Sequence, residues 1–150
     1  MHDRVNLSQA APELYAAVAE LERLASARAE AAGWARGFTH LLRLHASQIN
    51  GCAFCLRLHA RDALAAGESA DRVAVLPAWR ETNYFDARER AALALVEAVT
   101  RISDGQLPDT VYAEASAALS EAEIAAVEWI AVVINAWNRI AIPSRYPVGP

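Results

Sequence analysis

The chain has 150 residues, enough for one domain with a sizeable hydrophobic core. Hydrophobic residues make up 55% of it and charged residues only 21%, a balance that favours burial of further surface in a homo-oligomer. The net charge of −4 at pH 7 excludes the strongly basic surfaces typical of nucleic-acid and anionic-membrane binding, so neither partner is expected.

The longest apolar stretch covers residues 124–142 and contains several polar side chains. Because Glu128, Asn135, Asn138 and Arg139 interrupt it, the stretch does not predict a membrane-spanning helix. The N-terminal segment lacks the apolar core and cleavage site of a secretion signal. We therefore expect a cytoplasmic protein, in which a lone Cys-x-x-Cys pair is more often catalytic or metal-binding than structural.

Helical spacing of apolar residues predicts an all-α fold along the whole sequence. About seven helices are expected, over residues 8–32, 34–47, 52–66, 69–76, 86–102, from 108 onward and over 120–140, with an irregular loop over 77–85. Residues 1–150 are expected to form a single domain whose ends, 1–7 and 143–150, are flexible or extended.

Some helix starts carry clear signals. Asp86 with Glu89, and Ser120 with Glu123, have the spacing of capping boxes, in which each side chain pairs with the other residue's backbone N–H. Pro108 suits the first position of a helix, because the N–H that proline lacks would be unpaired there.

Both cysteines lie in one short stretch, residues 45–59. Cys52 and Cys55 follow the chain-breaking pair Asn50-Gly51, so both sulfurs are expected in the first turn of the third helix. Unpaired N–H groups and the helix dipole at that position stabilise a thiolate, which is the reactive form of cysteine. His59 follows Cys55 by four residues and Cys52 by seven, so one helix face carries two thiols and an imidazole.

The string over residues 46–55, followed by His59, resembles the motif of the carboxymuconolactone decarboxylase superfamily on its alkylhydroperoxidase D-like (AhpD-like) branch. The resemblance covers residues 35–142 or so, with further matches at 78–81 and 135–139. It implies an all-helical domain that assembles as trimers or hexamers and reduces peroxides or disulfides. It also implies a dithiol electron donor, either a lipoyl-bearing or a thioredoxin-like protein, and no metal or organic cofactor.

Cys52, Cys55 and His59 match the motif residue by residue, which implies a dithiol–disulfide cycle with histidine-assisted proton transfer. The glutamate of the motif falls on His40, so an imidazole would have to take the place of the carboxylate in the proton relay. Which sulfur attacks first stays open. The decarboxylase branch lacks the cysteine pair, so the motif does not imply lactone decarboxylation.

Other residues are weaker candidates. Glu81, in the expected loop, could be a second acid or base near the thiols or a partner of Arg80. His45 lies five residues after His40 and off its face, so a structural or subunit-contact role is expected. The remaining side chains are expected in a polar network or pocket wall (Asn135, Trp137 and Arg139) and in the core or an interface (Trp34 and Phe38).

Two other functions stay open. His40, Cys52, Cys55 and His59 form a Cys2His2 set and could hold zinc if helix two brings its histidine to the right distance. A non-catalytic, redox-sensing oligomer would use the same disulfide chemistry without turnover.

Overall fold

The computed structural model describes residues 3–150, and all regular structure in that range is helical. This confirms the all-α class. The elements in chain order are α1 (Leu7–Ala10), α2 (Pro12–Ala31), α3 (Arg36–Asn50), α4 (Ala53–Ala65), α5 (Ala70–Val75), the 3-10 helix η1 (Leu76–Glu81), α6 (Ala87–Thr100), α7 (Asp109–Ala118) and α8 (Glu121–Ser144).

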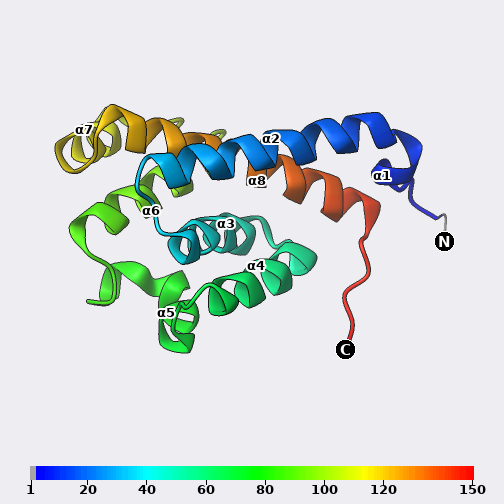
Figure 1. Cartoon of the computed structure of the whole chain (residues 1–150), viewed down its shortest axis with the longest axis horizontal. Helices are drawn as coiled ribbons and strands as arrows, with labels where there is room; N and C mark the ends of the chain where they lie inside the picture. The colour runs from blue at the N-terminus through cyan, green and yellow to red at the C-terminus, as the bar shows by residue number, and fades with distance from the viewer. Residues whose placement is uncertain (1–2) are drawn as a thin grey trace.

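The helices are arranged around α3, which packs against α4, α6 and α8 (Figure 1). The two longest helices, α2 and α8, run side by side along the top of the view, and α4 lies below α3. After α8 the C-terminal segment passes toward α4, where Arg57 donates a hydrogen bond to the carbonyl oxygen of Gly149 at 2.6 Å. The start of α4 therefore lies between the ends of α3 and α8.

The first predicted helix is in fact two helices, because the chain leaves the α conformation at Ala11. Ala11 has φ −144° and ψ 71°, and the residue before a proline is disfavoured in the α region. Asn6 caps the short α1 by accepting a hydrogen bond from the Ser8 N–H. The cysteine pair consequently opens the fourth helix of the described residues rather than the third. Residues 1–2 of the expected N-terminal extension lie outside the described residues.

Two other predicted boundaries differ from the structure. The segment expected to be an irregular loop, residues 77–85, begins inside η1, in which Pro77 stands in the first turn. The last helix extends to Ser144 rather than to about residue 140, and Pro143 lies in its final turn. Residues 146–150 have no regular structure, as expected for the tail.

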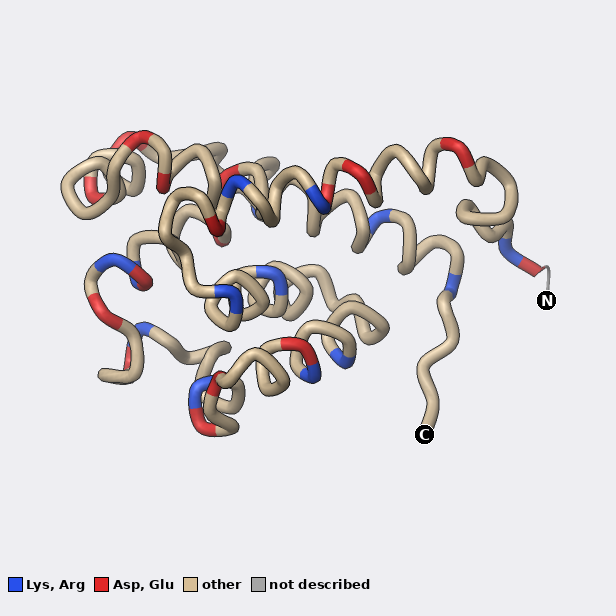
Figure 2. Tube along the Cα trace, viewed as in Figure 1, with Lys and Arg blue, Asp and Glu red and all other residues tan. Residues whose placement is uncertain are grey.

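Helix α8 is long and apolar enough to cross a membrane by length and composition alone. However, 56% of its most apolar window is buried inside the fold, as in the core helix of a soluble protein. The charged residues of α8 lie toward its two ends, and residues 129–138 between them carry no charge (Figure 2).

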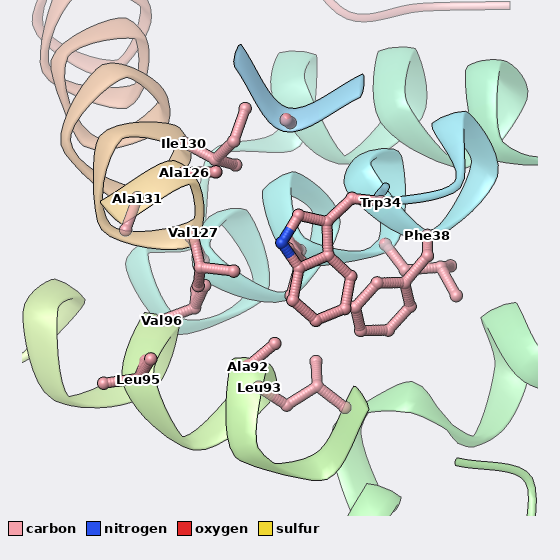
Figure 3. Close-up of a cluster of buried hydrophobic side chains, with 14 of the residues drawn as sticks. Trp34, Phe38, Ala92, Leu93, Leu95, Val96, Ala126, Val127, Ile130 and Ala131 are labelled. Atoms are coloured by element: carbon pink, nitrogen blue, oxygen red, sulfur yellow. The ribbon is translucent and has the colours of Figure 1, made fainter. Parts of the chain in front are cut away.

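The core lies where α3, α6 and α8 meet, and the predicted core residues Trp34 and Phe38 are at its centre. Their rings stack with centroids 5.4 Å apart, between Leu93 of α6 and Val127 of α8 (Figure 3). The indole N–H of Trp34 donates to the carbonyl oxygen of Glu123 at 3.3 Å, so its polar end is paired. Both predicted capping boxes are present and fix the starts of α6 and α8. The core therefore holds α3 in place against α6 and α8, and α4, which carries the cysteines, packs on α3.

Candidate functional site

The cysteine pair begins α4, as the sequence predicts. Helix α3 ends at Gly51, whose φ of 69° lies in the left-handed region that glycine adopts without strain. Cys52 is then the N-cap of α4, and its Sγ accepts a hydrogen bond from the backbone N–H of Cys55 at 3.4 Å. Both sulfurs thus lie at the N-terminal, electropositive end of a helix.

Cys52 and Cys55 form a disulfide bond with their Cα atoms 5.3 Å apart, a separation ordinary for a disulfide. Both residues are buried, and Phe54, Ala141 and Tyr146 pack around them. The rings of Phe54 and Tyr146 meet edge to face with centroids 5.2 Å apart. The short segment after α8 therefore covers one side of the disulfide.

A cavity of about 290 Å³ lies beside the disulfide, and its wall includes Cys55 but not Cys52 among the described residues. Helices α2, α3, α4 and α8 and the segment after α8 all contribute to it. Its wall has an apolar part (Tyr15, Phe54, Leu58, Trp137, Ala141 and Tyr146) and a polar part (Glu22, His40, His59 and Asp62). An apolar cavity with a few grouped polar side chains is the usual form of a small-molecule site.

Two of the predicted site residues, His40 of α3 and His59 of α4, meet in this cavity. Their rings stack with centroids 5.7 Å apart and planes 27° from parallel. The Nδ1 atom of each ring lies 3.9 Å from the same oxygen, Oδ2 of Asp62. Both Nδ1 atoms are buried and have no hydrogen-bond partner. The hydroxyl of Tyr146, also in the cavity wall, is likewise buried and unpaired.

Both histidines are neutral at pH 7. Burial lowers the pKa of His59 to about 3, and the charge of Arg43 and the neighbouring His40 act in the same direction. Burial also lowers the pKa of His40, helped by Arg43 and Arg36 and opposed by Asp62. A neutral imidazole has one free lone pair, so either ring can accept a proton from a neighbouring group.

The buried Arg43 forms an ion pair with Glu22, which is partly exposed. Their closest atoms are 2.6 Å apart, and Arg43 also donates to the hydroxyl of Ser26 at 2.7 Å. Glu22 in turn accepts a hydrogen bond from the indole N–H of Trp137 at 3.2 Å. Glu22 thus joins α2 to Arg43 of α3 and to Trp137 of α8, and it lies in the polar part of the cavity wall.

Three residues around the histidines were not predicted from the sequence: Glu22, Arg43 and Asp62. A local signal existed for two of them: Asp62 follows His59 by three residues and Arg43 follows His40 by three, so each shares a helix face with a candidate histidine. Glu22 lies on α2, far away in sequence, and only the packing of α2 on α8 brings it near.

His45 and Glu81 lie outside this cavity wall. His45 donates from Nε2 to Glu97 at 2.7 Å, and Glu97 also accepts from Trp79 at 2.9 Å and pairs with Arg80 at 2.7 Å. Burial raises the pKa of Glu97, but these hydrogen bonds together outweigh it and lower the pKa to about 2. His45 thus takes part in a hydrogen-bond network away from the cavity, which agrees with the structural role expected for it.

Glu81 is exposed at the end of η1 and lines a separate depression with Thr82, Asn83 and Tyr84. The structure does not bring this carboxylate to the cavity beside the thiols. The residue that organises this region is Glu97 instead.

The polar side chains of α8 divide between a network and the cavity wall. The amide of Asn50, at the end of α3, donates to Asn135 at 2.9 Å and to Asn138 at 2.8 Å. Arg139 is exposed and donates to Asn135, whereas Trp137 lines the cavity. The network fixes the end of α3, and with it the turn that leads to Cys52.

The side chains of His40, His59 and Asp62 offer three ligand atoms within 4.8 Å of one another, a set that a metal ion could use. The cysteines of the expected Cys2His2 set are not part of this cluster, because their sulfurs are joined in the disulfide. Arg43 and Arg36 also oppose positive charge on His40, and the same charges oppose a divalent cation there. The surroundings therefore suit neutral imidazoles better than a metal centre.

Comparisons with known proteins agree on the family of this chain. The carboxymuconolactone decarboxylase family matches residues 12–98. The uncharacterized protein YdfG of Bacillus subtilis (strain 168) is 33% identical over 142 residues, which are 95% of this chain and 94% of YdfG.

A solved structure of an Agrobacterium tumefaciens protein, described as of unknown function and as a candidate antioxidant defence protein AhpD, has the same fold. Its TM-score is 0.86 at 36% identity, over 99% of this chain and all of that one. With the helical fold and the cysteine pair at a helix start, these matches place the chain in the carboxymuconolactone decarboxylase superfamily, on its AhpD-like branch.

Proposed function

We propose that the chain is a thiol-dependent oxidoreductase that reduces peroxides or disulfides through a Cys52–Cys55 dithiol–disulfide cycle. The observation that carries this proposal is the disulfide at the start of α4, with Cys55 facing a cavity that also holds His59. A disulfide that borders a cavity can exchange with a molecule bound there, unlike one enclosed in a core. The disulfide represents the oxidised state of the cycle.

In the reduced state, the thiolate of Cys55 attacks the terminal oxygen of a hydroperoxide. A sulfur–oxygen bond forms, the oxygen–oxygen bond breaks, and the alcohol leaves with a proton, so that Cys55 becomes a sulfenic acid. The thiol of Cys52 then attacks this sulfur and water leaves, which restores the disulfide. Two electrons pass from the two thiols to the peroxide, and Cys55 is the attacking residue because it lines the cavity.

His59 takes the proton from the Cys55 thiol. It lies one helical turn after Cys55, lines the same cavity and is neutral at pH 7, so its lone pair is free. The imidazolium and thiolate then stabilise each other in the buried site. When the oxygen–oxygen bond breaks, His59 returns this proton to the leaving alkoxide. His40, stacked on His59, exchanges protons between His59 and the polar end of the cavity.

The cycle needs an external dithiol that returns two electrons and two protons through a mixed disulfide. A lipoyl-bearing or thioredoxin-like protein in the cytoplasm fits this requirement. The AhpD-like branch and the apolar composition also favour a homo-oligomer, a trimer or a hexamer.

The test is turnover of a panel of hydroperoxides and small disulfides, with dihydrolipoamide as electron donor, by the wild type, Cys52→Ser and Cys55→Ser. Neither variant should turn over. Cys52→Ser should still consume one equivalent of peroxide and trap a sulfenic acid on Cys55, whereas Cys55→Ser should not. Wild-type protein that reduces no member of the panel would contradict the proposal and leave the sensing role. Zinc that stays bound in a one-to-one ratio after mild chelation would favour a metal site.

A further inference from the structure

We propose that Asp62 is a positioning residue that orients both cavity histidines and balances the charge of the proton that they carry. The inference rests on the proposed function and extends it to a residue outside the cysteine motif. Its basis is the position of Asp62 Oδ2, which is 3.9 Å from Nδ1 of His40 and 3.9 Å from Nδ1 of His59.

The two Nδ1 atoms need a partner. Both are buried without a hydrogen bond, although buried polar atoms are nearly always paired. Asp62 lies within ion-pair distance of both, and its carboxylate has two oxygens that can accept from two donors. Its side chain is 41% exposed, so it is free to make the shift of about one ångström that turns either contact into a hydrogen bond.

A hydrogen bond to Asp62 would also select the tautomer of each ring. A neutral imidazole carries its proton on one nitrogen only, so a proton on Nδ1 facing Asp62 leaves the lone pair on Nε2. In His59 this makes Nε2 the nitrogen that accepts the proton of the Cys55 thiol. A histidine that receives its proton at one nitrogen while a carboxylate holds the other is a common arrangement in enzymes.

The charges around the two rings make Asp62 the available counter-charge. Arg43 of α3 opposes protonation of both histidines, and Arg36 of α3 opposes protonation of His40. Glu22 of α2 is already paired with Arg43, so its charge is largely offset. From α4, Asp62 is the group that favours protonation of His40. The segment after α8 contributes the neutral hydroxyl of Tyr146.

The test uses the reduced full-length protein and measures the rate of Cys55 alkylation by iodoacetamide between pH 5 and 9. Asp62→Asn keeps the size of the side chain and removes its charge. We expect alkylation near pH 7 to slow about tenfold and the pH profile to move upward by about one unit, the usual effect of losing an opposite charge at this range. Asp104→Asn, which alters an exposed aspartate on the turn after α6, should leave the profile unchanged.

A second variant separates this role from a structural one. His40→Glu replaces the ring that stacks on His59 with a carboxylate, which can balance the charge of a proton on His59 directly. The double variant His40→Glu with Asp62→Asn should therefore regain a profile close to that of the wild type. An Asp62→Asn profile that superimposes on the wild type, or a double variant no faster than Asp62→Asn, would overturn the proposal. Because alkylation needs no turnover, a protein that reduces no substrate would contradict the proposed function without affecting this result.

Discussion

His59 differs from an ordinary surface histidine because the fold resists its protonation. Its pKa of about 3 in the folded protein lies well below the ordinary value of 6.5. Between these values the unfolded chain binds a proton that the folded chain does not, so stability falls as the pH drops below about 6.5. His40, whose pKa is also lowered, acts in the same direction.

We therefore expect the disulfide form to lose stability between pH 7 and pH 5, with about 2 kcal/mol of the loss due to His59. His59→Asn should show a correspondingly smaller difference between the two pH values. Urea unfolding of both proteins at pH 7 and pH 5 measures this effect. The same pH difference in wild type and variant, with unchanged urea dependence, would mean that His59 is protonated in the folded protein.

Some residues of the site could be predicted from their spacing in the sequence, and others are brought there only by the packing of helices. The two cysteines and His59 lie within eight positions of one another on a single helix, so their spacing alone places them on one face. The stacking of His40 on His59 depends on how α3 packs on α4, and the Glu22–Arg43 pair depends on how α2 packs on α3. No short-range pattern encodes either packing. Glu81 was proposed for the site because loops often carry function, but it ends η1 on an exposed surface, beside a depression separate from the cavity.

Among the elements, α3, η1 and α6 are joined by Glu97. This carboxylate accepts hydrogen bonds from His45 of α3 and Trp79 of η1 and pairs with Arg80. Because His45 and Trp79 are buried, replacing the carboxylate leaves their donors without a charged acceptor.

Glu97→Gln should lower the free energy of unfolding at pH 7 by about 2–3 kcal/mol, because hydrogen bonds to a charged group are among the strongest in a fold. Its folded-state pKa of about 2 lies below the ordinary 4.5, so the contribution is present above about pH 4.5 and lost as the pH falls toward 2. The matched control is Glu81→Gln, on an exposed carboxylate, with an expected change within about 0.5 kcal/mol. Equal urea midpoints for the two variants would show that the network contributes little.

Helix boundaries were predictable where a short-range sequence pattern marks them. The capping boxes of α6 and α8 follow from side chains three positions apart and are confirmed. The break at Ala11 was missed because helical spacing continues across it, although the following proline disfavours the α region there. The end of α8 was placed too early, because Pro143 is tolerated in a last turn that packs near α1, where Ser144 accepts from the Leu7 N–H.

At the scale of the whole molecule, the high share of hydrophobic residues predicts that some apolar side chains stay exposed on a single chain. Helix α8 carries part of this exposed apolar surface. Ala125, Trp129, Val132 and Ala136 recur at spacings of four, three and four, so they form one stripe opposite the buried face of α8. Trp129 is 48% exposed, unusual for so large an apolar side chain. In the proposed homo-oligomer, a second copy of the chain would pack against this stripe of α8.

Trp129→Glu should therefore dissociate the oligomer, because it places a charge in the centre of the stripe. Light scattering after size-exclusion chromatography should give the mass of one chain for this variant and a multiple of it for the wild type. Ile102→Glu, at an exposed apolar residue on the turn after α6, should keep the wild-type mass. Far-ultraviolet circular dichroism checks that both variants remain helical. A wild-type mass of one chain would contradict the oligomer itself, whereas an unchanged multiple for Trp129→Glu would move the interface away from α8.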